Sequence, residues 1–304
     1  IPVTGSSKFS GRNVRFGLLA FRFVLSGGAC HAAGAIYSHG SKGSVIMRKR
    51  YFFFDIDGTL AAGPIADRRV PESAAFALQQ LRAQGHFTAI CTGRGYAMAL
   101  PYMKEHGFSD MVCDGGNGIV LDGTLRGVEP LDREACIRVL EECDRLGRPW
   151  ALSCDLTRRR YSRMPEFDDL VRDAYMSTVV DPDLDYHAID CFYKLFLPCS
   201  EKEEVLLSSL SFVPTARFSP YVLFVEPVDK GNGVKRVMDV YGADYADAVV
   251  FGDGSNDVSM FLSEWTCVAM GNAIDELKAR ADFVTTDADK DGILNACRHH
   301  GWVS

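Results

Sequence analysis

The sequence lacks the features that mark several large classes of protein. It has no run close to the roughly 18 to 20 uninterrupted apolar residues that a membrane-spanning helix needs. None of its 10 cysteines forms a CxxC pair, so neither a zinc ribbon nor a small disulfide scaffold is indicated. Basic charge is not in excess either, since the net charge is -7 and the isoelectric point is about 5.5. We therefore expect a cytoplasmic protein with reduced thiols that binds neither nucleic acid nor membrane.

Acidic side chains are missing from the first 46 residues, which carry a charge of +5. Since the whole chain carries -7, the other 258 residues carry -12. The segment could be a targeting peptide, although Arg22 interrupts its apolar run Phe16–Leu25, or a structured extra element. It could also be translated sequence upstream of the natural start, because the first methionine is Met47. We favour this last interpretation and expect residues 1–46 to be a disordered or non-native leader.

Short apolar runs alternate with amphipathic stretches in the rest of the chain. Tyr51–Phe54 and Phe87–Cys91 predict strands buried on both faces, and a predicted helix follows each of them. This alternation is typical of parallel sheets with crossover helices. We therefore predict an α/β fold, with a doubly wound, Rossmann-like parallel-sheet core from residues 47–128 and 227–304. Residues 129–226 are predicted to be an inserted α+β domain.

The inserted segment has a different order of predicted elements from the core. It is expected to contain a helix, a hairpin, a helix, a strand, a helix and a strand, at 131–146, 150–154 with 160–163, 166–176, 191–197, 201–210 and 221–225. The core then resumes with a helix from Lys230 and a strand at 248–251, followed by a helix at 258–262. The remaining core strands and helices alternate to the end of the chain.

The first polar cluster is DIDGT at residues 55–59, directly after the first predicted strand. In an open α/β sheet, ligands bind at the carboxyl ends of the strands. Two carboxylates at such a position, Asp55 and Asp57, are costly unless a cation or a phosphate site uses them. Mg²⁺ suits the position, because it is held by few carboxylates together with water and substrate phosphate. The alternative, an aspartate pair that caps the next helix, is disfavoured by the preceding strand and the following Gly-Thr.

Three further clusters lie at comparable positions. The turn Thr92-Gly93-Arg94 can hold an anion through its hydroxyl and N–H groups, although such turns are often helix caps. Lys230 opens a predicted helix, where its positive charge opposes the helix dipole. Such a lysine usually points into solvent, but beside a phosphate site it would neutralise the phosphoryl oxygens. Asp253, Asn256 and Asp257 follow another apolar strand, and helix capping explains one of them but not all three.

These clusters, in this order, resemble the motifs of the haloacid dehalogenase-like superfamily, and in particular its Cof-like phosphatases. The motifs that carry the resemblance are FFFDIDGTL (52–60), CTGR (91–94), Lys230-Gly231, FGDGSNDVSMF (251–261), VAMGNA (268–273) and TTDADKDGILNAC (285–297). The resemblance extends from about Met47 to the end of the chain. It implies that residues 129–226 form the α/β cap domain, of the second type, that this branch inserts between its second and third motifs.

The resemblance also implies a role for each motif residue. Asp55 is the expected nucleophile, and Asp57 the expected general acid and base. Mg²⁺ is expected on Asp55, on the backbone carbonyl of Asp57 and on Asp253. The expected phosphate ligands are Thr92, Gly93, Lys230, Asn256 and the backbone N–H groups of Ile56 and Gly58. Three residues are expected to support the site from behind, namely Thr59, Asp257 and Arg94, the last by stabilising its own turn.

The function implied is Mg²⁺-dependent hydrolysis of a small phosphorylated metabolite, a sugar phosphate or similar, through an aspartyl-phosphate. Two alternatives remain within the superfamily. A phosphomutase would return the phosphoryl group to substrate, which a bisphosphate requirement would reveal. A non-catalytic regulator that binds phosphometabolites would be expected to lack Asp55, Asp57 or Asp253, and all three are present.

Three other features receive structural interpretations. The basic run Arg158-Arg159-Arg160 is expected to be a solvated hairpin tip rather than a second anion site. Gly115–Gly118 is expected to be a turn that leads to the cap, since no GK[ST] follows it. Cys91, beside the Thr92 turn, is expected to pack in the core, because nothing near it in sequence would activate a thiol.

Overall fold

The computed structural model describes residues 48–64, 67–172 and 176–304. The predicted leader, residues 1–46, lies outside the described residues. No helix in the described part of the chain combines the length and the apolar character that crossing a membrane requires.

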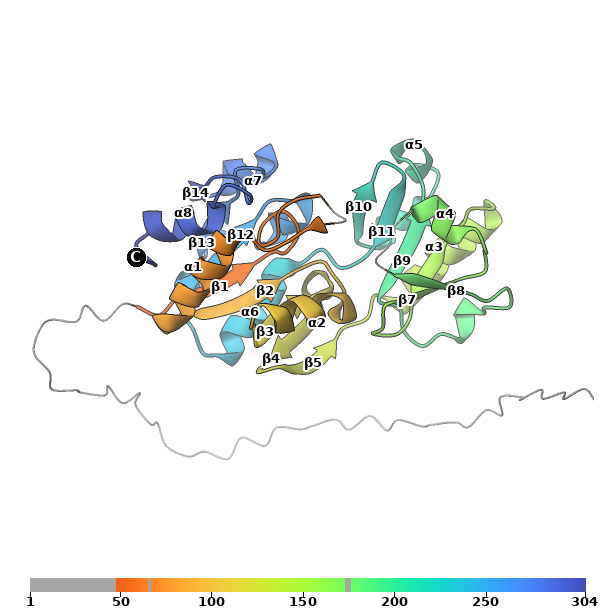
Figure 1. The fold of residues 1–304 in the computed structure, drawn as a ribbon. Coiled ribbons are helices and arrows are strands. Elements are labelled where there is room, and N and C mark those ends of the chain that lie inside the picture. Colours follow the sequence, from red (N-terminus) through yellow and green to blue (C-terminus); the bar gives the residue numbers. More distant parts are fainter. Residues whose placement is uncertain (1–47, 65–66, 173–175) are drawn as a thin grey trace, which may run out of the picture. The chain divides into compact units, whose positions relative to one another are not determined.

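The larger of two sheets has eight strands (Figure 1). In spatial order they are β14 (Phe283–Val284), β13 (Thr266–Ala269), β12 (Ala248–Gly252), β1 (Tyr51–Phe54), β2 (Phe87–Cys91), β3 (Asp110–Cys113), β4 (Gly118–Leu121) and β5 (Thr124–Val128). Neighbours from β14 to β3 run parallel, which confirms the predicted parallel core. The β3–β4 and β4–β5 pairs are antiparallel. Strand β5 was not predicted, because its largely exposed sequence TLRGV lacks an apolar run.

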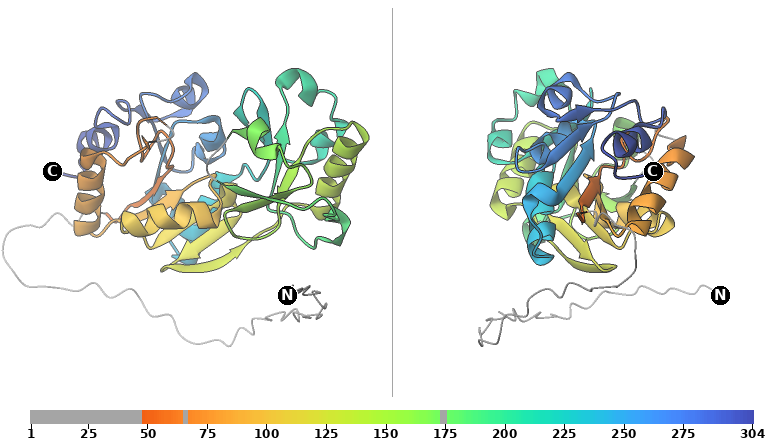
Figure 2. Two further views of the ribbon diagram at one scale, coloured as in Figure 1. Left: turned by 45° about the vertical axis from the view of Figure 1, so that its right-hand side comes forward. Right: turned by 90° about the vertical axis from the view of Figure 1, so that its left-hand side faces the viewer.

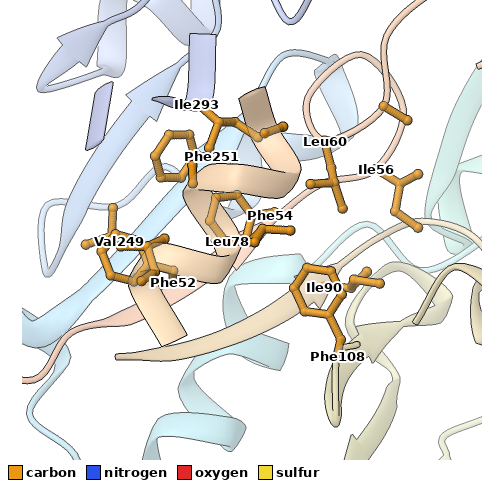
Figure 3. Close-up of a cluster of buried hydrophobic side chains, with 14 of the residues drawn as sticks. Phe52, Phe54, Ile56, Leu60, Leu78, Ile90, Phe108, Val249, Phe251 and Ile293 are labelled. Carbon is orange, nitrogen blue, oxygen red and sulfur yellow. The ribbon is translucent and has the colours of Figure 1, made fainter. Parts of the chain in front are cut away.

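Strand β1 lies in the middle of this sheet because all four of its side chains are apolar enough to be buried. Phe52 and Phe54 point to one face, where Phe54 packs against Phe251 with ring centroids 4.9 Å apart (Figure 3). Tyr51 and Phe53 point to the other face. Burial on both faces is what a central parallel strand requires, and it holds the end of β1, where Asp55 begins, in a rigid position.

Helices cover both faces of this sheet, as the prediction of a doubly wound core requires. One face is packed by α1 (Glu72–Ala83), α2 (Tyr96–Glu105) and α8 (Gly292–His299). The orange α1 and the dark blue α8 lie side by side in both views of Figure 2. The other face is packed by α6 (Lys230–Val240), α7 (Asp275–Arg280) and the 3₁₀ helix η6 (Ser255–Met260). Short 3₁₀ turns also occur at η2 (Asp114–Gly116) and η5 (Tyr245–Asp247).

The second sheet has six strands, and all of them fall within residues 129–226. In spatial order they are β10 (Thr215–Ser219), β11 (Val222–Val225), β9 (Lys194–Pro198), β6 (Ala151–Ser153), β7 (Arg159–Ser162) and β8 (Ser177–Val180). All pairs are antiparallel except β7–β8. One face packs against α3 (Arg133–Arg145), and the other carries α4 (Phe167–Val171). The division of the chain into a core and a cap at these bounds stays a prediction.

Several predicted elements of the second sheet were wrong. The helix predicted over 166–176 is shorter, because α4 ends at Val171 and Arg172 adopts a left-handed conformation with φ +54°. Residues 173–175 of that prediction lie outside the described residues, and Ser177–Val180 beyond it form β8, a strand that was not predicted. The helix predicted over 201–210 is broken into α5 (Glu201–Glu204) and the 3₁₀ helix η4 (Ser208–Phe212). In the core, the helix predicted over 258–262 is the 3₁₀ helix η6.

The basic run 158–160 is also not the solvated tip that was predicted. Arg160 belongs to β7 and its side chain is fully buried, whereas that of Arg159 is 53% exposed. Consecutive side chains of a strand point to opposite faces, so one of two neighbouring arginines is carried into the interior. The prediction failed because charge composition alone does not reveal which face is covered.

Candidate active site

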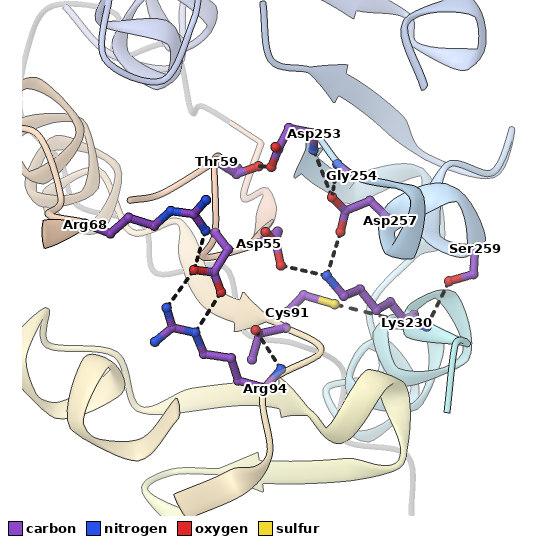
Figure 4. A network of polar contacts seen from close by, with 12 residues as sticks. Asp55, Thr59, Arg68, Cys91, Arg94, Lys230, Asp253, Gly254, Asp257 and Ser259 are labelled. Carbon is purple, nitrogen blue, oxygen red and sulfur yellow. Dashed lines mark hydrogen bonds and ion pairs between the residues drawn. The ribbon is translucent and has the colours of Figure 1, made fainter. Parts of the chain in front are cut away.

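The four polar clusters lie together at one edge of the larger sheet (Figure 4). Asp55 and Asp57 follow β1, the turn 92–94 follows β2, and residues 253–257 follow β12. These three strands are neighbours in the sheet, and parallel neighbours end at the same edge. Lys230 reaches the same place from the start of α6.

Lys230 is a fully buried cation at the base of this cluster. Its Nζ donates to Asp55 Oδ1 over 2.7 Å and to Asp257 Oδ1 over 2.6 Å. Because a cation in the first turn opposes the helix dipole, these two carboxylates supply the compensation. Burial disfavours the ammonium, but the attraction of Asp257 and Asp55 outweighs it and raises the pKa of Lys230. Lys230 is therefore a fixed positive charge that holds the Asp55 carboxylate in position.

Three carboxylates gather beside this cation. Asp55, Asp253 and Asp257 each present an oxygen within 4.8 Å of the others. Asp257 Oδ2 also accepts the backbone N–H groups of Asp253 and Gly254, at 2.8 and 2.9 Å. Burial and the repulsion of Asp257 raise the pKa of Asp253 to about 6. Burial also raises the pKa of Asp55, against the attraction of Lys230 and with the help of the two neighbouring carboxylates. The cluster holds more negative charge than one ammonium balances.

This donor set fits a hard divalent cation. Carboxylate oxygens are the ligands that Mg²⁺ prefers, and a bound cation would lower the raised pKa values of the cluster. Polar partners orient the carboxylate of Asp253: Thr59 Oγ1 donates to Oδ1 over 2.7 Å, and Asn272 Nδ2 lies 3.3 Å from Oδ2. Asn272 also donates to the carbonyl of Gly58 over 2.8 Å, which ties the β1 loop to the same cluster.

Asp57 is held apart from this cluster by two guanidinium groups. Arg94 binds both of its oxygens, Nε to Oδ2 and Nη2 to Oδ1, each over 2.7 Å. Arg68 Nη1 donates to Oδ1 over 2.6 Å. Burial alone would raise the pKa of Asp57, but these hydrogen bonds and charges outweigh it and lower the pKa. The expectation that Arg94 stabilises its own turn describes only its backbone, whose N–H donates to Thr92 Oγ1 over 3.1 Å. Its side chain donates two hydrogen bonds to the carboxylate of Asp57.

A cavity of about 310 Å³ opens over these groups. Six of the predicted residues line it, namely Asp55, Asp57, Thr92, Gly93, Arg94 and Asn256. Lys230 and Ile56 have fully buried side chains. The arrangement places a fixed carboxylate, hydroxyl and amide groups, and the arginines Arg68, Arg94 and Arg217 around one small space.

Gly58 is required by the close packing of the β1 loop. Its φ is +91°, and a Cβ at this position would lie 2.3 Å from Asp253 Oδ2. Its backbone N–H donates to the carbonyl of Ala61 over 2.9 Å. The predicted contact of this N–H with a phosphate would therefore require the bond to Ala61 to open.

Two residues of the site were missed by the sequence analysis. Arg68 lies in no recognisable sequence motif, and the only signal at this position is the charge of the pair Arg68-Arg69. Asn272 lies in VAMGNA, which carried the family resemblance but was given no role. Cys91, by contrast, is buried as predicted, and burial raises the pKa of its thiol to about 12. It is therefore a neutral core side chain and not a nucleophile.

Comparison with known proteins identifies the family. The sequence model of the haloacid dehalogenase-like hydrolases matches residues 52–297. The chain belongs to this family. The Bacillus subtilis (strain 168) protein named "Putative phosphatase YkrA" is 31% identical over 261 residues, which cover 84% of this chain and 99% of that protein. The resemblance to Cof-like phosphatases is confirmed.

Solved structures of other proteins share the fold of this chain. A protein from Geobacillus kaustophilus HTA426 superposes with a TM-score of 0.72 at 30% identity, covering 84% of this chain and all of that chain. The subclass IIB sugar phosphatase BT4131 gives a TM-score of 0.69 at 25% identity, with the same coverage. Together with the family match, these relatives identify the chain as a haloacid dehalogenase-like phosphatase, a phosphoric monoester hydrolase.

Proposed function

We propose that this phosphatase hydrolyses a small phosphorylated metabolite in a Mg²⁺-dependent reaction, with Asp55 as the nucleophile. The observation that carries the proposal is the placement of Asp55. Its carboxylate directly follows the buried central strand β1, is anchored by Lys230 and lines the cavity with Thr92, Gly93 and Asn256. A nucleophile must be held against its target, and these contacts supply that restraint.

The reaction has two displacements. A carboxylate oxygen of Asp55 attacks phosphorus, the bond from phosphorus to the alcohol oxygen breaks, and Asp57 gives its proton to the leaving alcohol. Water then attacks the aspartyl-phosphate, Asp57 takes the proton of the water, and the bond between Asp55 and phosphorus breaks. Inorganic phosphate leaves and both aspartates return to their starting forms. Thr92, Gly93 and Asn256 are the proposed phosphate ligands at the cavity wall, with Lys230 and the Ile56 and Gly58 N–H groups behind it.

The two guanidinium groups on Asp57 bear on its double role. By lowering the pKa of Asp57, Arg94 and Arg68 favour the carboxylate, the form that accepts a proton from water. The first displacement needs the protonated form. A phosphate dianion in the cavity would attract both guanidinium groups and so weaken their hold on Asp57, which raises its pKa when substrate is present.

Mg²⁺ is the proposed cofactor of this site. Asp55, the backbone carbonyl of Asp57 and Asp253 would hold it, with Asp257 and Thr59 beside them. When bound, the ion supplies the positive charge that lets an anionic carboxylate approach an anionic phosphate. The raised pKa values of Asp55 and Asp253 support this proposal, because burial first and the neighbouring carboxylates second disfavour negative charge there, and a bound cation would offset both effects.

The size of the cavity supports a small substrate. Its volume of about 310 Å³ is near the lower end of the range of about 300 to 1,000 Å³ that is usual for small-molecule sites. We also propose a cytoplasmic location, since all nine cysteines of the described residues are free thiols, as in reducing compartments.

The test is phosphate release from a panel of phosphorylated metabolites, with and without Mg²⁺. We expect release to require Mg²⁺ and to fall by about 10³-fold or more in Asp55→Asn, because a covalent nucleophile is lost. Mass spectrometry after acid quenching should find phosphate on the peptide that contains Asp55 in the wild-type protein.

The matched control is Asp244→Asn, which changes a carboxylate that is 67% exposed and paired with Arg48. It should retain wild-type turnover, and thermal unfolding should show that both variants are folded. Near-normal turnover of folded Asp55→Asn would contradict the nucleophile assignment. Release that does not respond to Mg²⁺ or to a chelator would contradict the cofactor assignment.

A further inference from the structure

Asp114 is a buried carboxylate that the proposed reaction does not use. It follows β3 and begins η2, the residue is 9% exposed, and its backbone has a left-handed φ of +49°. Removing a carboxylate from water is costly unless hydrogen bonds or positive charge replace the water. The groups that face this carboxylate therefore show what keeps it in the interior.

The carboxylate of Asp114 caps helix α2 from another loop. Tyr96, the first residue of α2, donates its backbone N–H to Asp114 Oδ2 over 2.9 Å. The N-cap of α2 is Gly95, which has no side chain to accept such a bond, and the first turn of α2 contains no acidic residue. A negative charge near the start of a helix is favourable, because the unpaired N–H groups give that end a positive character. Asp114 thus supplies the cap that the sequence of α2 lacks.

Two glycines leave room for this carboxylate. A Cβ on Gly95 would lie 3.3 Å from Asp114 Oδ1, and a Cβ on Gly118 would lie 3.0 Å from Asp114 Oδ2. The carboxylate therefore occupies a narrow slot between two stretches of backbone. Close packing fixes its position in addition to the hydrogen bond from α2.

The backbone next to this carboxylate is bound to the turn 92–94. The N–H of Asp114 donates to the carbonyl of Arg94 over 2.9 Å, and the N–H of Gly115 donates to the carbonyl of Thr92 over 3.2 Å. The side chains of Thr92 and Arg94 lie at the cavity, where Arg94 binds both oxygens of Asp57. Together with the cap on α2, these bonds fix the backbone of the turn whose side chains hold the reacting groups.

Resting on the proposed function, we propose that Asp114 is a positioning residue for phosphoryl transfer, which holds the turn 92–94 against the phosphate and Asp57. The path runs from the Asp114 carboxylate through the start of α2 to the guanidinium of Arg94, which orients the carboxyl group of Asp57 toward the leaving alcohol. A small displacement of a group that must donate a proton lowers the rate steeply. The position of the turn therefore matters most when the leaving group needs that proton.

The experiment compares two substrates whose leaving groups differ in their need for a proton. One is ribose 5-phosphate, or whichever primary-alcohol ester of the panel above is turned over fastest, and its alcohol leaves with a proton from Asp57. The other is acetyl phosphate, whose acetate leaves without a proton. The quantity compared is kcat/KM, because it covers the steps up to the aspartyl-phosphate and excludes the hydrolysis of this intermediate.

Asp114→Gly is the informative variant, because glycine adopts a φ of +49° without strain while the carboxylate is lost. It should lower kcat/KM by about 30-fold for the ester, and by about threefold for acetyl phosphate, for which the phosphate ligand Thr92 matters but the proton does not. Asp114→Asn keeps an oxygen that can accept the Tyr96 N–H, so it should recover activity to within about threefold of wild type on both substrates. The matched control is Asp122→Gly, which should change neither value, since Asp122 has the same φ of +49° but is exposed.

A second comparison tests the path through Arg94. Arg94→Gln should itself lower the ratio of kcat/KM for the ester to kcat/KM for acetyl phosphate. Adding Asp114→Gly to Arg94→Gln should then change this ratio by less than about twofold, because the group through which Asp114 acts is already gone.

Thermal unfolding checks that each variant is folded. If Asp114→Gly does not fold, Gly95→Ala takes its place, since the added Cβ would crowd Asp114 Oδ1 and displace the carboxylate. It should also lower kcat/KM more for the ester than for acetyl phosphate.

Three results would overturn the inference while the proposed function stands. They are no loss or an equal loss on the two substrates in Asp114→Gly, an Asp114→Asn variant as impaired as Asp114→Gly, and a ratio that falls further when Asp114→Gly is added to Arg94→Gln. A failure of the proposed function looks different. The wild-type protein would then release phosphate neither from the esters of the panel nor from acetyl phosphate with Mg²⁺ present, and the inference would fall with it.

Discussion

At the scale of single residues, Arg160 shows how a charged side chain is stabilised in the interior of this protein. Its guanidinium lies between the rings of Phe167 and Phe196, 5.1 and 5.4 Å from their centroids. Nη2 donates to Asp168 over 2.7 Å, and Nε to Thr178 Oγ1 over 2.8 Å. A flat guanidinium can stack its faces on rings while its in-plane N–H groups donate in several fixed directions, and a lysine ammonium has no such planar fork. Arg160 thus packs against Phe196, a residue that lines the cavity.

We predict that Arg160→Lys lowers the free energy of unfolding by about 1 to 3 kcal/mol, since both the stacking and the fork of hydrogen bonds are lost. The neighbouring Arg159→Lys is the control, because that side chain is 53% exposed and should cost less than about 0.5 kcal/mol. Urea unfolding of the two variants measures the difference. Equal effects at the two positions would contradict the structural role of Arg160.

At the scale of elements, one carboxylate joins helix α3 to the 3₁₀ helix η4. Glu142 accepts from Ser208 Oγ over 2.9 Å, from the Ser209 N–H over 2.8 Å and from Ser209 Oγ over 2.6 Å. Burial would raise the pKa of Glu142, but the hydrogen bonds from Ser209 and Ser208 outweigh it and lower the pKa to about 2. Glu142 thus gives the backbone N–H of Ser209 a hydrogen-bond partner at the place where the predicted helix 201–210 is broken.

A pH dependence follows from this lowered pKa. A glutamate in the unfolded chain has a pKa of about 4.3. The charged form of Glu142 therefore stabilises the fold above that pH, and this contribution to the free energy of unfolding is lost as the pH falls toward 2. Glu142→Gln should therefore be about 1 to 2 kcal/mol less stable than wild type at pH 7, with a clearly smaller difference at pH 3. Urea unfolding at both pH values measures this.

The control is Glu141→Gln. The side chain of Glu141 is 53% exposed, and its Oε1 lies 3.7 Å from His187 Nε2. It should differ from wild type by less than about 0.5 kcal/mol at either pH. A stability difference for Glu142→Gln that is the same at pH 7 and pH 3 would show that the charge of this residue contributes nothing.

At the scale of the whole molecule, both connections between the two sheets are tied to one glycine turn. Asp229 N–H donates to the carbonyl of Gly115 over 2.9 Å, and Glu129 N–H donates to the carbonyl of Asn117 over 3.1 Å. Asn117 Nδ2 returns a bond of 2.9 Å to the carbonyl of Glu129. The turn predicted from the glycine run therefore holds the chain both where it leaves the core sheet and where it re-enters it.

We predict that Gly115→Ala is strongly destabilising, because a Cβ there would lie 1.8 Å from the carbonyl oxygen of Pro227. Gly123→Ala is the control: its φ of +72° is close to the +63° of Gly115, but no atom lies within 4 Å of the added Cβ. Both variants should lose about 1 to 2 kcal/mol of unfolding free energy to left-handed strain, and Gly115→Ala about 1 to 3 kcal/mol more. Urea unfolding that finds equal losses would contradict the close approach.

Much of the core and of the candidate site could be predicted because the signals are local. A run such as Tyr51–Phe54 can be buried on both faces only in the middle of a sheet, which makes β1 a central strand. Residues that follow parallel strands lie at one edge whatever the details of packing. Asp55, Thr92 and Asp253 could therefore be placed together without a structure. The short, half-exposed strands β5, β8 and β10 were not predicted. Few of their side chains are buried, so their sequences show no clear apolar pattern.

The sequence by itself determined the α/β core, the edge of the sheet where the polar residues gather, and the family. Only the tertiary structure decided that Arg68 and Arg94 share Asp57, that Arg160 is buried, and that Phe196, Phe218 and Phe224 line the same cavity as Asp55. The physical reason is the range of the interactions. Whether a strand is buried, and which residues follow its end, can be read from residues that are close in sequence. The contacts named above join strands and loops that are far apart in sequence, and no local pattern shows which of them become neighbours.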